Sequence, residues 1–464
     1  MSSTTMSRQP EQNKMGTMPV NRLLISMSLP MIISMLVQAL YNIIDSVFVA
    51  QISEAALAAV SMAFPVQSLM IAVSTGTCVG VNALLSRSLG EGKQEEARLA
   101  AVNGIFLAIL GALAFLLFGL FGAHTYFSSQ TSDPLIIEYG TQYLEICTVF
   151  SFGIFGEIIL ERILQSTGRT IYNMYSQGIG AIINIVLDPI MIFGLLGCPA
   201  MGISGAAAAT VIGQIIAMFL ALYFNLKKNH DVSINMRGFR PDMRIIRIIY
   251  SVGLPSIIMQ SITSVMTYGM NLILISFSAT AVTVLGIYFK LQSFIFMPIF
   301  GLNNGMIPII AYNYGARSKK RIMDTAKLSI AIAISIMLLG LAVFQVFTPQ
   351  LLMLFNASDN LLEMGIPALR TISLCFPAAA LGISFSNFFQ AIGEGKNSLL
   401  ISVLRQLFIL LPAAWLISRI GTLNQVWLAF PIAEVFALIV SILLLKLTYK
   451  SKIHDMEYLA AEEE

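Results

Sequence analysis

The feature that most constrains this chain is a series of long apolar stretches separated by short polar breaks. There are twelve such stretches, and each is long enough to cross the roughly 30 Å hydrocarbon core of a bilayer as a helix. Their approximate ranges are 22–50, 57–86, 98–121, 135–163, 171–196, 203–226, 247–276, 281–311, 325–347, 361–388, 396–418 and 424–447. The short alternating segments of a membrane barrel are absent. The sequence therefore predicts an all-α integral membrane protein with twelve transmembrane helices.

The composition excludes several other classes. The chain is 57% hydrophobic and only 11% charged, whereas a soluble domain carries about 25% charged residues. The four cysteines are scattered without a CxxC pair, and the three histidines form no metal-binding motif, so neither a metal centre nor a cofactor is expected. The segment GEGKNS at 393–398 lacks two positions of a Walker A loop. We therefore expect neither an enzyme nor a nucleotide-driven pump.

The distribution of lysine and arginine predicts the orientation in the membrane. The segment 1–21 is polar, and we expect it to form a cytoplasmic tail before an uncleaved first span. The alternate loops and the C-terminal tail that share this side hold nearly all the basic residues, whereas the opposite loops hold essentially Arg419 alone. Both termini are therefore expected to be cytoplasmic. Basic loops such as 317–321 also occur in nucleic-acid-binding and head-group-binding proteins, but retention of positive charge inside explains them, and no nucleic acid partner is expected.

The chain repeats itself at a constant offset of 225 residues, the difference between Pro30 and Pro255. This offset superimposes apolar and polar positions alike, namely Pro30 on Pro255, Phe64 on Phe289, Gln67 on Gln292, Gly76 on Gly301, Gly80 on Gly305 and Gly90 on Gly315. Two six-helix lobes follow, at 22–226 and 247–447, with a cytoplasmic linker at 227–246 and tails at 1–21 and 448–464. Because six is even, the lobes are parallel repeats related by a pseudo-two-fold axis along the membrane normal.

Ionisable residues inside the spans divide unequally between the lobes. Placing a charged side chain at the bilayer centre costs about 2.5–3.5 kcal/mol of insertion free energy, so such a residue is expected to have a partner or a function. The first lobe holds Asp45, Glu145, Glu157, Glu161 and Asp188, and the second holds Lys290, Arg370, Arg405 and Glu434. We therefore predict cation binding in the first lobe. The charges of the second lobe are expected to pair with one another, for example Lys290 with Glu434.

Four oxygen-bearing side chains fall at a similar depth in the outer half of the first lobe. Asp45 and Asp188 each lie near the outer end of a span, Asn184 precedes Asp188 by one helical turn, and Thr210 lies just inside the next span. Two carboxylates at one level require a cation or a shared proton, which predicts a proton or sodium site. The alternative is structural, with Asp45 capping a helix break and Asp188 neutralised by Asn184 and by carbonyls near Pro189.

A second set of residues is expected to line a cavity for flat, apolar cations. This candidate set comprises Gln38, Tyr41, Asn42, Glu157, Met266, Tyr268, Met270 and Gln292. Methionine adapts to ligands of different shapes, although most methionines in a membrane protein are packing residues. Glu157 belongs to the set only if its helix faces the interior, and Glu161 has the alternative of pairing with Arg162 or Arg169.

Several segments resemble the multidrug and toxic compound extrusion (MATE) transporters, and are most similar to the bacterial DinF/MepA-like branch. The resemblance runs in order along nearly the whole chain and is carried by NIIDSVFVAQISEAALAAVSMAFP from Asn42, LQSTGRT from Leu164, NIVLDPIMIFG from Asn184, GAAAATVIGQ from Gly205 and FMPIFGLNNGMIPIIAYNYGARSKKR from Phe296. It implies export of organic, mostly cationic, drugs and dyes, and thus antibiotic resistance, in exchange for inward H⁺ or Na⁺. The expected setting is the bacterial plasma (inner) membrane, with the protein acting as a monomer.

The resemblance also implies roles for individual residues. By motif, Asp45 matches the acidic residue of the first helix, while Asn184, Asp188 and Thr210 match the first-lobe cation site and Gln38 and Tyr41 match nearby cavity residues. Another branch carries an acidic residue in the seventh helix. Here the equivalent position lies near Thr263, which argues against a second cation site. The expected cycle neutralises Asp45 and Asp188, bends the first helix and displaces the drug outward.

Two other functions fit parts of the same pattern. A lipid-linked precursor flippase of the same superfamily keeps the fold but changes the cargo. An ion-translocating subunit of a larger membrane complex uses intramembrane charges without an organic cargo. A membrane-embedded enzyme lacks a visible catalytic pair. The twelve spans and the acidic first lobe favour the exporter.

Overall fold

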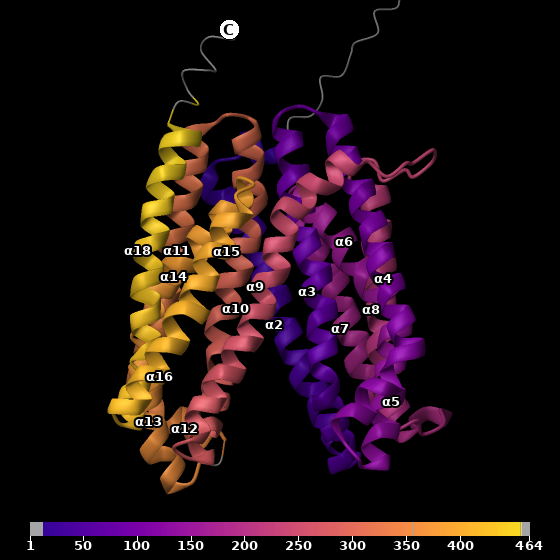
Figure 1. Ribbon diagram of the computed structural model, residues 1–464. Coiled ribbons are helices and arrows are strands. Elements are labelled where there is room, and N and C mark those ends of the chain that lie inside the picture. The colour runs from indigo at the N-terminus through magenta and orange to yellow at the C-terminus, as the bar shows by residue number, and fades with distance from the viewer. Residues whose placement is uncertain (1–12, 356, 455, 457–464) are drawn as a thin grey trace, which may run out of the picture.

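The computed structural model describes residues 13–355, 357–454 and 456, and within these ranges it contains helices and no strand (Figure 1). The first half forms α1 (Lys14–Thr17), α2 (Val20–Ala50), α3 (Glu54–Gly90), α4 (Gln94–Gln130), α5 (Pro134–Val149), α6 (Phe152–Ser166), α7 (Thr170–Phe193), the 3-10 helix η1 (Leu195–Gly197) and α8 (Ile203–Lys228). The second half forms α9 (Met243–Ile275), α10 (Ala279–Gly315), α11 (Lys319–Val346), α12 (Thr348–Met353), α13 (Asp359–Ser373), α14 (Phe376–Ala391), α15 (Gly395–Val403), the π-helix η2 (Leu404–Leu410), α16 (Leu411–Ile420), α17 (Leu423–Val426), α18 (Ala429–Thr448) and the π-helix η3 (Tyr449–Ile453).

The prediction of twelve membrane spans is confirmed within the described part of the chain. Ten helical stretches are long and apolar enough to cross a bilayer by themselves. The other two spans are bent pairs, α5 with α6 at an angle of 42° and α13 with α14 at 49°. The all-α, two-lobe fold class is therefore correct. The helices extend past the predicted ends, because the polar first and last turns lie outside the apolar stretches from which the spans were read.

Prolines within the predicted spans mostly do not interrupt the helices. Helices continue through Pro30, Pro189 and Pro255. The chain breaks instead at residues 150–151 and 374–375, and only the second break lies close to a proline, Pro377. Pro377 lies in the first turn of α14, where its missing N–H costs no helical hydrogen bond, so a helix can begin there.

Equivalent polar residues start equivalent helices in the two lobes. The Ser53 hydroxyl accepts a hydrogen bond from the backbone N–H of Ala56 at 3.0 Å and so caps α3. Ser278, its equivalent in the repeat, accepts from the N–H of Ala281 at 3.1 Å and caps α10. The repeat in the sequence therefore specifies local structure as well as overall topology.

The N-lobe (α2 to α8) and the C-lobe (α9 to η3) meet through α2, α3, α9 and α10. Repeated glycines allow the close approach. A Cβ atom on Gly76 would lie 2.8 Å from the backbone nitrogen of Ile257, and one on Gly301 would lie 2.7 Å from that of Ile32. Ile32 and Ile257 are themselves equivalent positions of the repeat. These reciprocal contacts are what a pseudo-two-fold axis between the lobes requires.

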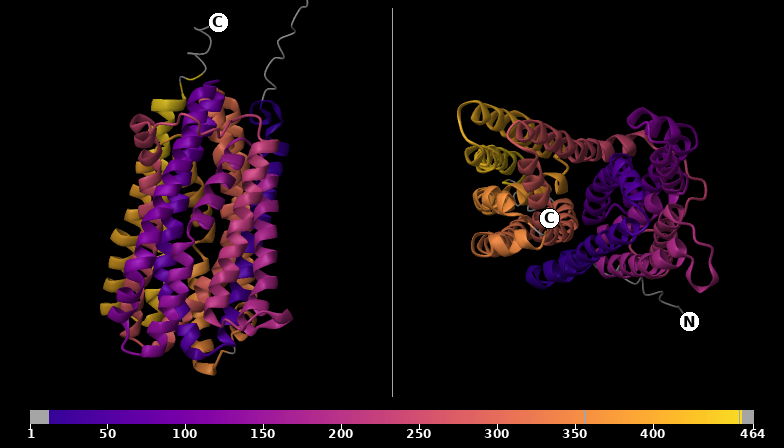
Figure 2. Two further views of the ribbon diagram at one scale, coloured as in Figure 1. Left: turned by 90° about the vertical axis from the view of Figure 1, so that its right-hand side faces the viewer. Right: turned by 90° about the horizontal axis from the view of Figure 1, so that it is seen from below.

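Contacts between the lobes gather at the end of the molecule that carries the termini. There Ser28 donates to the carbonyl of Leu302 at 3.1 Å, and Arg162 donates to the side chain of Asn304 at 3.3 Å. Figure 1 shows the lobes side by side at this end and spread apart at the opposite end, and Figure 2 shows them separate when viewed from below.

The short helix α1 binds both lobes at the same end. Arg321 of α11 donates to the carbonyls of Met15 and Met18 at 2.9 and 2.8 Å. Asn13 donates to the carbonyl of Thr167 at the end of α6, at 3.1 Å. Part of the predicted N-terminal tail is thus packed structure, with Met15 fully buried.

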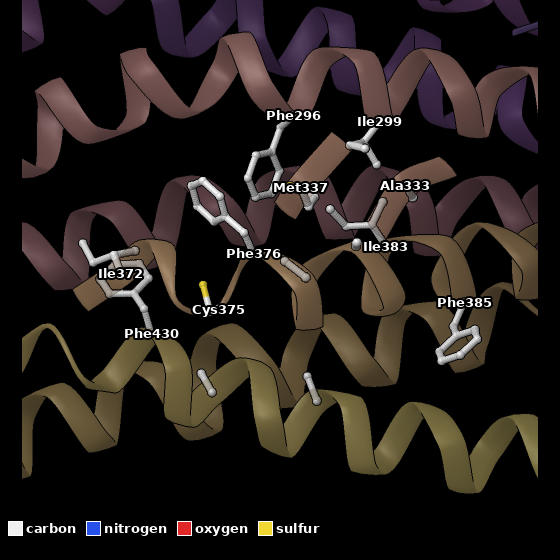
Figure 3. Close-up of a cluster of buried hydrophobic side chains, with 14 of the residues drawn as sticks. Phe296, Ile299, Ala333, Met337, Ile372, Cys375, Phe376, Ile383, Phe385 and Phe430 are labelled. Carbon is white, nitrogen blue, oxygen red and sulfur yellow. The ribbon is translucent and has the colours of Figure 1, made fainter. Parts of the chain in front are cut away.

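Aromatic packing organises the core of the C-lobe (Figure 3). The ring of Phe376, at the start of α14, lies 5.5 Å from that of Phe296 on α10 and 5.2 Å from that of Phe344 on α11, measured between centroids. Offset and edge-on aromatic pairs contribute about 0.5–1.5 kcal/mol beyond their buried area. The core therefore fixes the second half of the bent tenth span against the helices that meet the N-lobe.

Candidate functional site

The candidate ion site is built on the close packing of α7 and α8. Gly180 of α7 and Gly213 of α8 face each other, and a Cβ atom on Gly213 would lie 2.8 Å from the carbonyl oxygen of Gly180. Gly205 meets the backbone of Met191 in the same way, with a Cβ 2.5 Å from its carbonyl oxygen. Small residues let membrane helices approach until their polar side chains can bond to one another.

Three of the four predicted ion-site residues meet at this contact. Asn184 donates to the hydroxyl of Thr210 at 3.2 Å and, at a longer 3.5 Å, to one carboxylate oxygen of Asp188. Asn184 and Asp188 are buried, at 3% and 0% exposure, while Thr210 is half-buried. The predicted one-turn spacing therefore brings an amide, a carboxylate and a hydroxyl together between two helices.

The fourth residue, Asp45, reaches the cluster from α2, which packs along α7. The rings of Phe48 and Phe193 lie 6.4 Å apart and align the ends of these two helices. Asp45 is half-buried and close enough to Asp188 for the two charges to interact. Asp45 therefore brings a second carboxylate from α2 to the cluster formed by α7 and α8.

This cluster has more acceptors than donors. Among the described residues, one oxygen of Asp45, one of Asp188 and the amide oxygen of Asn184 are buried without a hydrogen-bond partner. Pro189 adds another acceptor, because it has no N–H to offer the carbonyl one turn earlier. Buried acceptors without donors cost about 1–3 kcal/mol each, more when charged. Protons or a hard cation would satisfy such a set.

The described residues contain no group of three or more His, Cys, Asp or Glu side chains arranged to hold a metal ion. The candidate site instead offers two carboxylates, an amide and a hydroxyl. That donor set is composed entirely of oxygen and fits a monovalent hard cation better than a transition metal.

The predicted cavity residues on α2 and α6 lie beside this cluster. Tyr41 is within electrostatic range of three carboxylates, those of Asp45, Glu157 and Asp188. Gln38 and Glu157 are half-buried, and Asn42 is exposed. Glu157 therefore lies within electrostatic range of Tyr41, and its place in a cargo cavity stays a prediction.

Of the two partners proposed for Glu161, Arg169 is wrong, whereas Arg162 lies within electrostatic range of Glu161. Glu161 accepts a hydrogen bond from Ser176 at 2.7 Å, while Arg169 pairs with Asp231 of the linker at 3.1 Å. Arg162 bonds across to the C-lobe, as described above. Glu161 therefore bonds to α7, while Arg169, which directly precedes α7, bonds to the linker.

The seventh-span residues do not form a common surface. Met266 and Met270 are 6% and 0% exposed within the C-lobe core, whereas Tyr268 is 67% exposed on another face of α9. Tyr268 does not share a face with the two methionines, since positions two apart in a helix point in different directions. Gln292 of α10 is half-buried, and its side-chain oxygen has no partner among the described residues.

The predicted pairing of Lys290 with Glu434 is also wrong. Glu434 of α18 pairs with Arg405 of η2 at 3.3 Å, because α18 packs against η2. Lys290 lies instead 6.0 Å from the ring centroid of Phe355 and is exposed. Arg405 sits in a π-helix just before Pro412, a local geometry that hydrophobic periodicity does not reveal.

Sequence reasoning missed one polar contact near the site. Gln67 of α3 donates to the hydroxyl of Tyr143 on α5 at 3.2 Å, next to the buried Cys147. Asp45 also acts electrostatically on Tyr143 and Cys147. One feature of the sequence could have indicated this contact. Gln67 recurs as Gln292 in the second lobe, and a polar side chain retained at equivalent positions of two membrane spans needs a hydrogen-bond partner inside the protein.

Comparison with known families agrees with this architecture. The model of the MatE family matches twice, once over residues 30–190 and again over residues 255–416. The chain belongs to the MatE family. The two matches fall on the two halves of the internal repeat, and they confirm the resemblance to MATE transporters. As a MatE protein, the chain is a multi-pass membrane protein.

Similar curated proteins cover almost all of this MatE chain. The multidrug export protein MepA of Staphylococcus haemolyticus is 26% identical over 409 residues, which are 88% of this chain and 89% of MepA. A protein of Shewanella oneidensis named as an FAD transporter is 28% identical over 435 residues, 90% of this chain and 92% of that protein.

Solved structures show the same fold. An outward-facing multidrug resistance MATE transporter of the MOP superfamily matches with a TM-score of 0.89 and 27% identity, covering 97% of this chain and all of that one. MATE structures described as bent and as straight both match with a TM-score of 0.89, at 27% identity. They cover 98% and 97% of this chain respectively, and 100% of each matched chain.

Proposed function

We propose that this protein is a secondary active multidrug exporter that expels organic, mostly cationic, compounds in exchange for inward H⁺ or Na⁺. The observation that carries the proposal is the cluster of buried oxygen acceptors without donors at Asp45, Asn184 and Asp188. The relatives named as multidrug export proteins support the cargo class. No enzymatic step is part of this proposal.

The coupling follows from the electrostatics of the cluster. A half-buried carboxylate, Asp45, and a buried one, Asp188, are unfavourable as a doubly charged pair in a low-dielectric interior. Binding a proton or a sodium ion removes that repulsion and relaxes the hydrogen bonds of Asn184 and Thr210. Because Asp45 stands on α2, and α2 also contacts the C-lobe, a change at the cluster reaches the interface between the lobes. Bending of α2 then displaces the cargo.

The cargo is expected to meet the polar and aromatic residues of the N-lobe around Tyr41. Gln38, Asn42 and Glu157 supply acceptors for a cation near that ring, and a cation over an aromatic face gains about 0.5–2 kcal/mol. A cation that binds next to Asp45 competes electrostatically with the coupling ion. This competition is the physical basis of exchange.

The orientation proposed is with both termini in the cytoplasm of a bacterial cell and the protein acting as a monomer. The lysine and arginine distribution supports this orientation. The lobes then meet on the cytoplasmic side and spread on the outer side, where Asp45 and Asp188 lie. We assign this arrangement to the outward-facing half of an alternating-access cycle.

An anionic cargo is the second candidate. The relative named as an FAD transporter and the exposed Lys290 of the C-lobe favour it. A lipid-linked precursor flippase shares this expectation of a cationic binding surface. The acidic surroundings of Tyr41 favour the cationic cargo over both.

The test is efflux of ethidium and of FAD from proteoliposomes that contain only this protein, driven in turn by a sodium gradient and by a pH gradient. We expect ethidium efflux under one gradient and its loss in Asp45→Asn and in Asp188→Asn. Normal efflux by both variants would refute the ion site. Transport of FAD alone would establish the second candidate. No transport of either compound would favour a flippase or a subunit of a larger complex.

A further inference from the structure

A cavity of about 300 Å³ lies within the C-lobe at the end nearest the termini. It sits between α11 and α18, each of which packs against α14. Its walls are almost entirely apolar and include Met306 of α10, Ala326 of α11 and Phe388 of α14. Phe385, set apart from the other labelled side chains in Figure 3, also lines it. The size is at the lower end of the range of small-molecule sites.

Two positive charges stand at the edge of this cavity. Lys327 of α11 and Lys446 of α18 both line it, and both are exposed. Neither forms an ion pair with any other part of the described chain. Lys327 is near the start of the predicted span 325–347 and Lys446 near the end of 424–447, so both lie at the membrane boundary on the side of the termini.

A third polar group lies deeper in the wall. Ser384 of α14 is 1% exposed and lines the cavity, and its hydroxyl has no hydrogen-bond partner among the described residues. This hydroxyl is therefore a buried polar group in the cavity wall that no other described residue satisfies. The π-helix η3 follows α18 at this point and contributes Tyr449 and Ile453 to the cavity wall. Such π segments are often found at functional sites.

The repeat shows that these polar features are particular to the C-lobe. At the offset that places Pro30 on Pro255, Lys327 corresponds to Val102 and Lys446 to Ala221. Ser384 corresponds to Ile159 at the same offset. All three equivalents in the N-lobe are apolar and nearly fully buried. The fold itself therefore does not require the lysines or the serine.

The chain covers the equivalent surface of the N-lobe with its own linker. The backbone N–H of Asp242 donates to Asn103 of α4 at 3.1 Å, and the ring of Phe239 lies 5.7 Å from that of Phe106. The linker therefore covers the surface of α4 that corresponds to the surface of α11 lining the cavity. The C-lobe thus has a hollow in a position where the N-lobe is closed.

We propose that this cavity binds an acyl chain of an anionic phospholipid, with the phosphate on Lys327 and Lys446 and an ester carbonyl accepting from the Ser384 hydroxyl. The apolar walls match an alkyl chain, and the paired lysines at the membrane boundary match an anionic head group. Bound there, the lipid bridges α11 and α18 and stabilises the C-lobe. This site is independent of the ion site of the N-lobe.

The test is binding of dioleoyl phosphatidylglycerol to the purified full-length protein, followed by native mass spectrometry and by thermal stability in a neutral detergent. The double variant Lys327→Gln/Lys446→Gln is expected to bind about 30-fold more weakly, about fivefold for each lysine near the head group. Ser384→Ala is expected to weaken binding about fivefold. Dioleoyl phosphatidylcholine is expected to bind weakly to all variants.

The matched control is Lys227→Gln/Lys228→Gln, which removes two exposed lysines at the same end of the N-lobe. This control is expected to bind phosphatidylglycerol like the unmodified protein. Equal losses in the two double variants would overturn the proposal, since they would reflect net charge alone. Equal protection by glycerol phosphate would show an anion site without an acyl chain. Binding of oleate but not of phosphatidylglycerol would replace the phospholipid with a free fatty acid.

Discussion

Substituting Gly305 by alanine should open the contact between the lobes at the end that carries the termini. A Cβ atom there would lie 2.8 Å from both the backbone nitrogen and the Cα of Ser28, and it would also crowd the Ser28 hydroxyl. Backbone atoms of α2 cannot move aside without shifting the helix. Overpacking of this kind costs about 1–3 kcal/mol, which changes an equilibrium between two conformations by about 5–150-fold.

Gly286→Ala is the matched control in the same helix. Nothing lies within 4 Å of a Cβ at Gly286. Both substitutions gain about the same helix propensity, about 1 kcal/mol, so any difference between them reports on the lobe contact. Gly80→Ala, the repeat equivalent, should act like Gly305→Ala because its Cβ would meet the backbone of Ile249.

Pulsed electron-electron double resonance between spin labels at Lys93→Cys and Lys320→Cys, with the exposed Cys198 replaced by serine, measures the separation of the lobes. We expect a longer distance component in Gly305→Ala and Gly80→Ala, with ethidium efflux slowed. Chromatographic monodispersity checks that each variant is folded. If Gly305→Ala gives the same distance distribution as Gly286→Ala, the glycines do not hold the lobes together and the reasoning is refuted.

Three further variants test individual contacts. Glu434→Ala should lower stability by about 3 kcal/mol by leaving Arg405 unpaired in the C-lobe, and replacing both residues by methionine should recover most of that loss in thermal unfolding. Arg321→Ala removes two charge-assisted hydrogen bonds to α1, so hydrogen exchange of residues 13–18 should accelerate at least tenfold; unchanged exchange would show that α1 is held by other contacts. Met266→Ala should cost about 2 kcal/mol of packing without changing the relative efflux of different dyes, whereas a selective loss of one dye would return this residue to the cargo surface.

The overall architecture was predictable because hydrophobic length and basic charge act over whole segments. The sequence contains twelve apolar stretches, and the repeat divides them into two sets of six. Because six is even, only an arrangement of two parallel six-helix lobes fits this pattern. The same offset also identified the glycines Gly76 and Gly301 before their role was known. Their contact with Ile257 and Ile32 explains why they recur, since a Cβ atom at either of these two positions would collide with the opposite backbone.

Placement within a span was predictable only where spacing along one helix decides it. Asn184 and Asp188 lie one turn apart, and the structure brings them together as that spacing requires. Partners on different helices depend on helix rotation and on local irregularities. The π-helix η2 carries Arg405 to Glu434, and the rotation of α9 buries Met266. Neither feature has a periodic signal, so neither the Arg405–Glu434 pair nor the burial of Met266 could be predicted from the sequence.

The most direct test of the account is the ion flux that accompanies export. Proteoliposomes with a gradient of ethidium and no initial ion gradient should show countermovement of protons, followed by a pH-sensitive dye, or of radioactive sodium. We expect one of these ions to move in the unmodified protein and neither to move in Asp188→Asn, although that variant remains folded. Ethidium movement without any ion flux, or unchanged ion flux in Asp188→Asn, would contradict the claim that the N-lobe cluster couples the ion to the cargo.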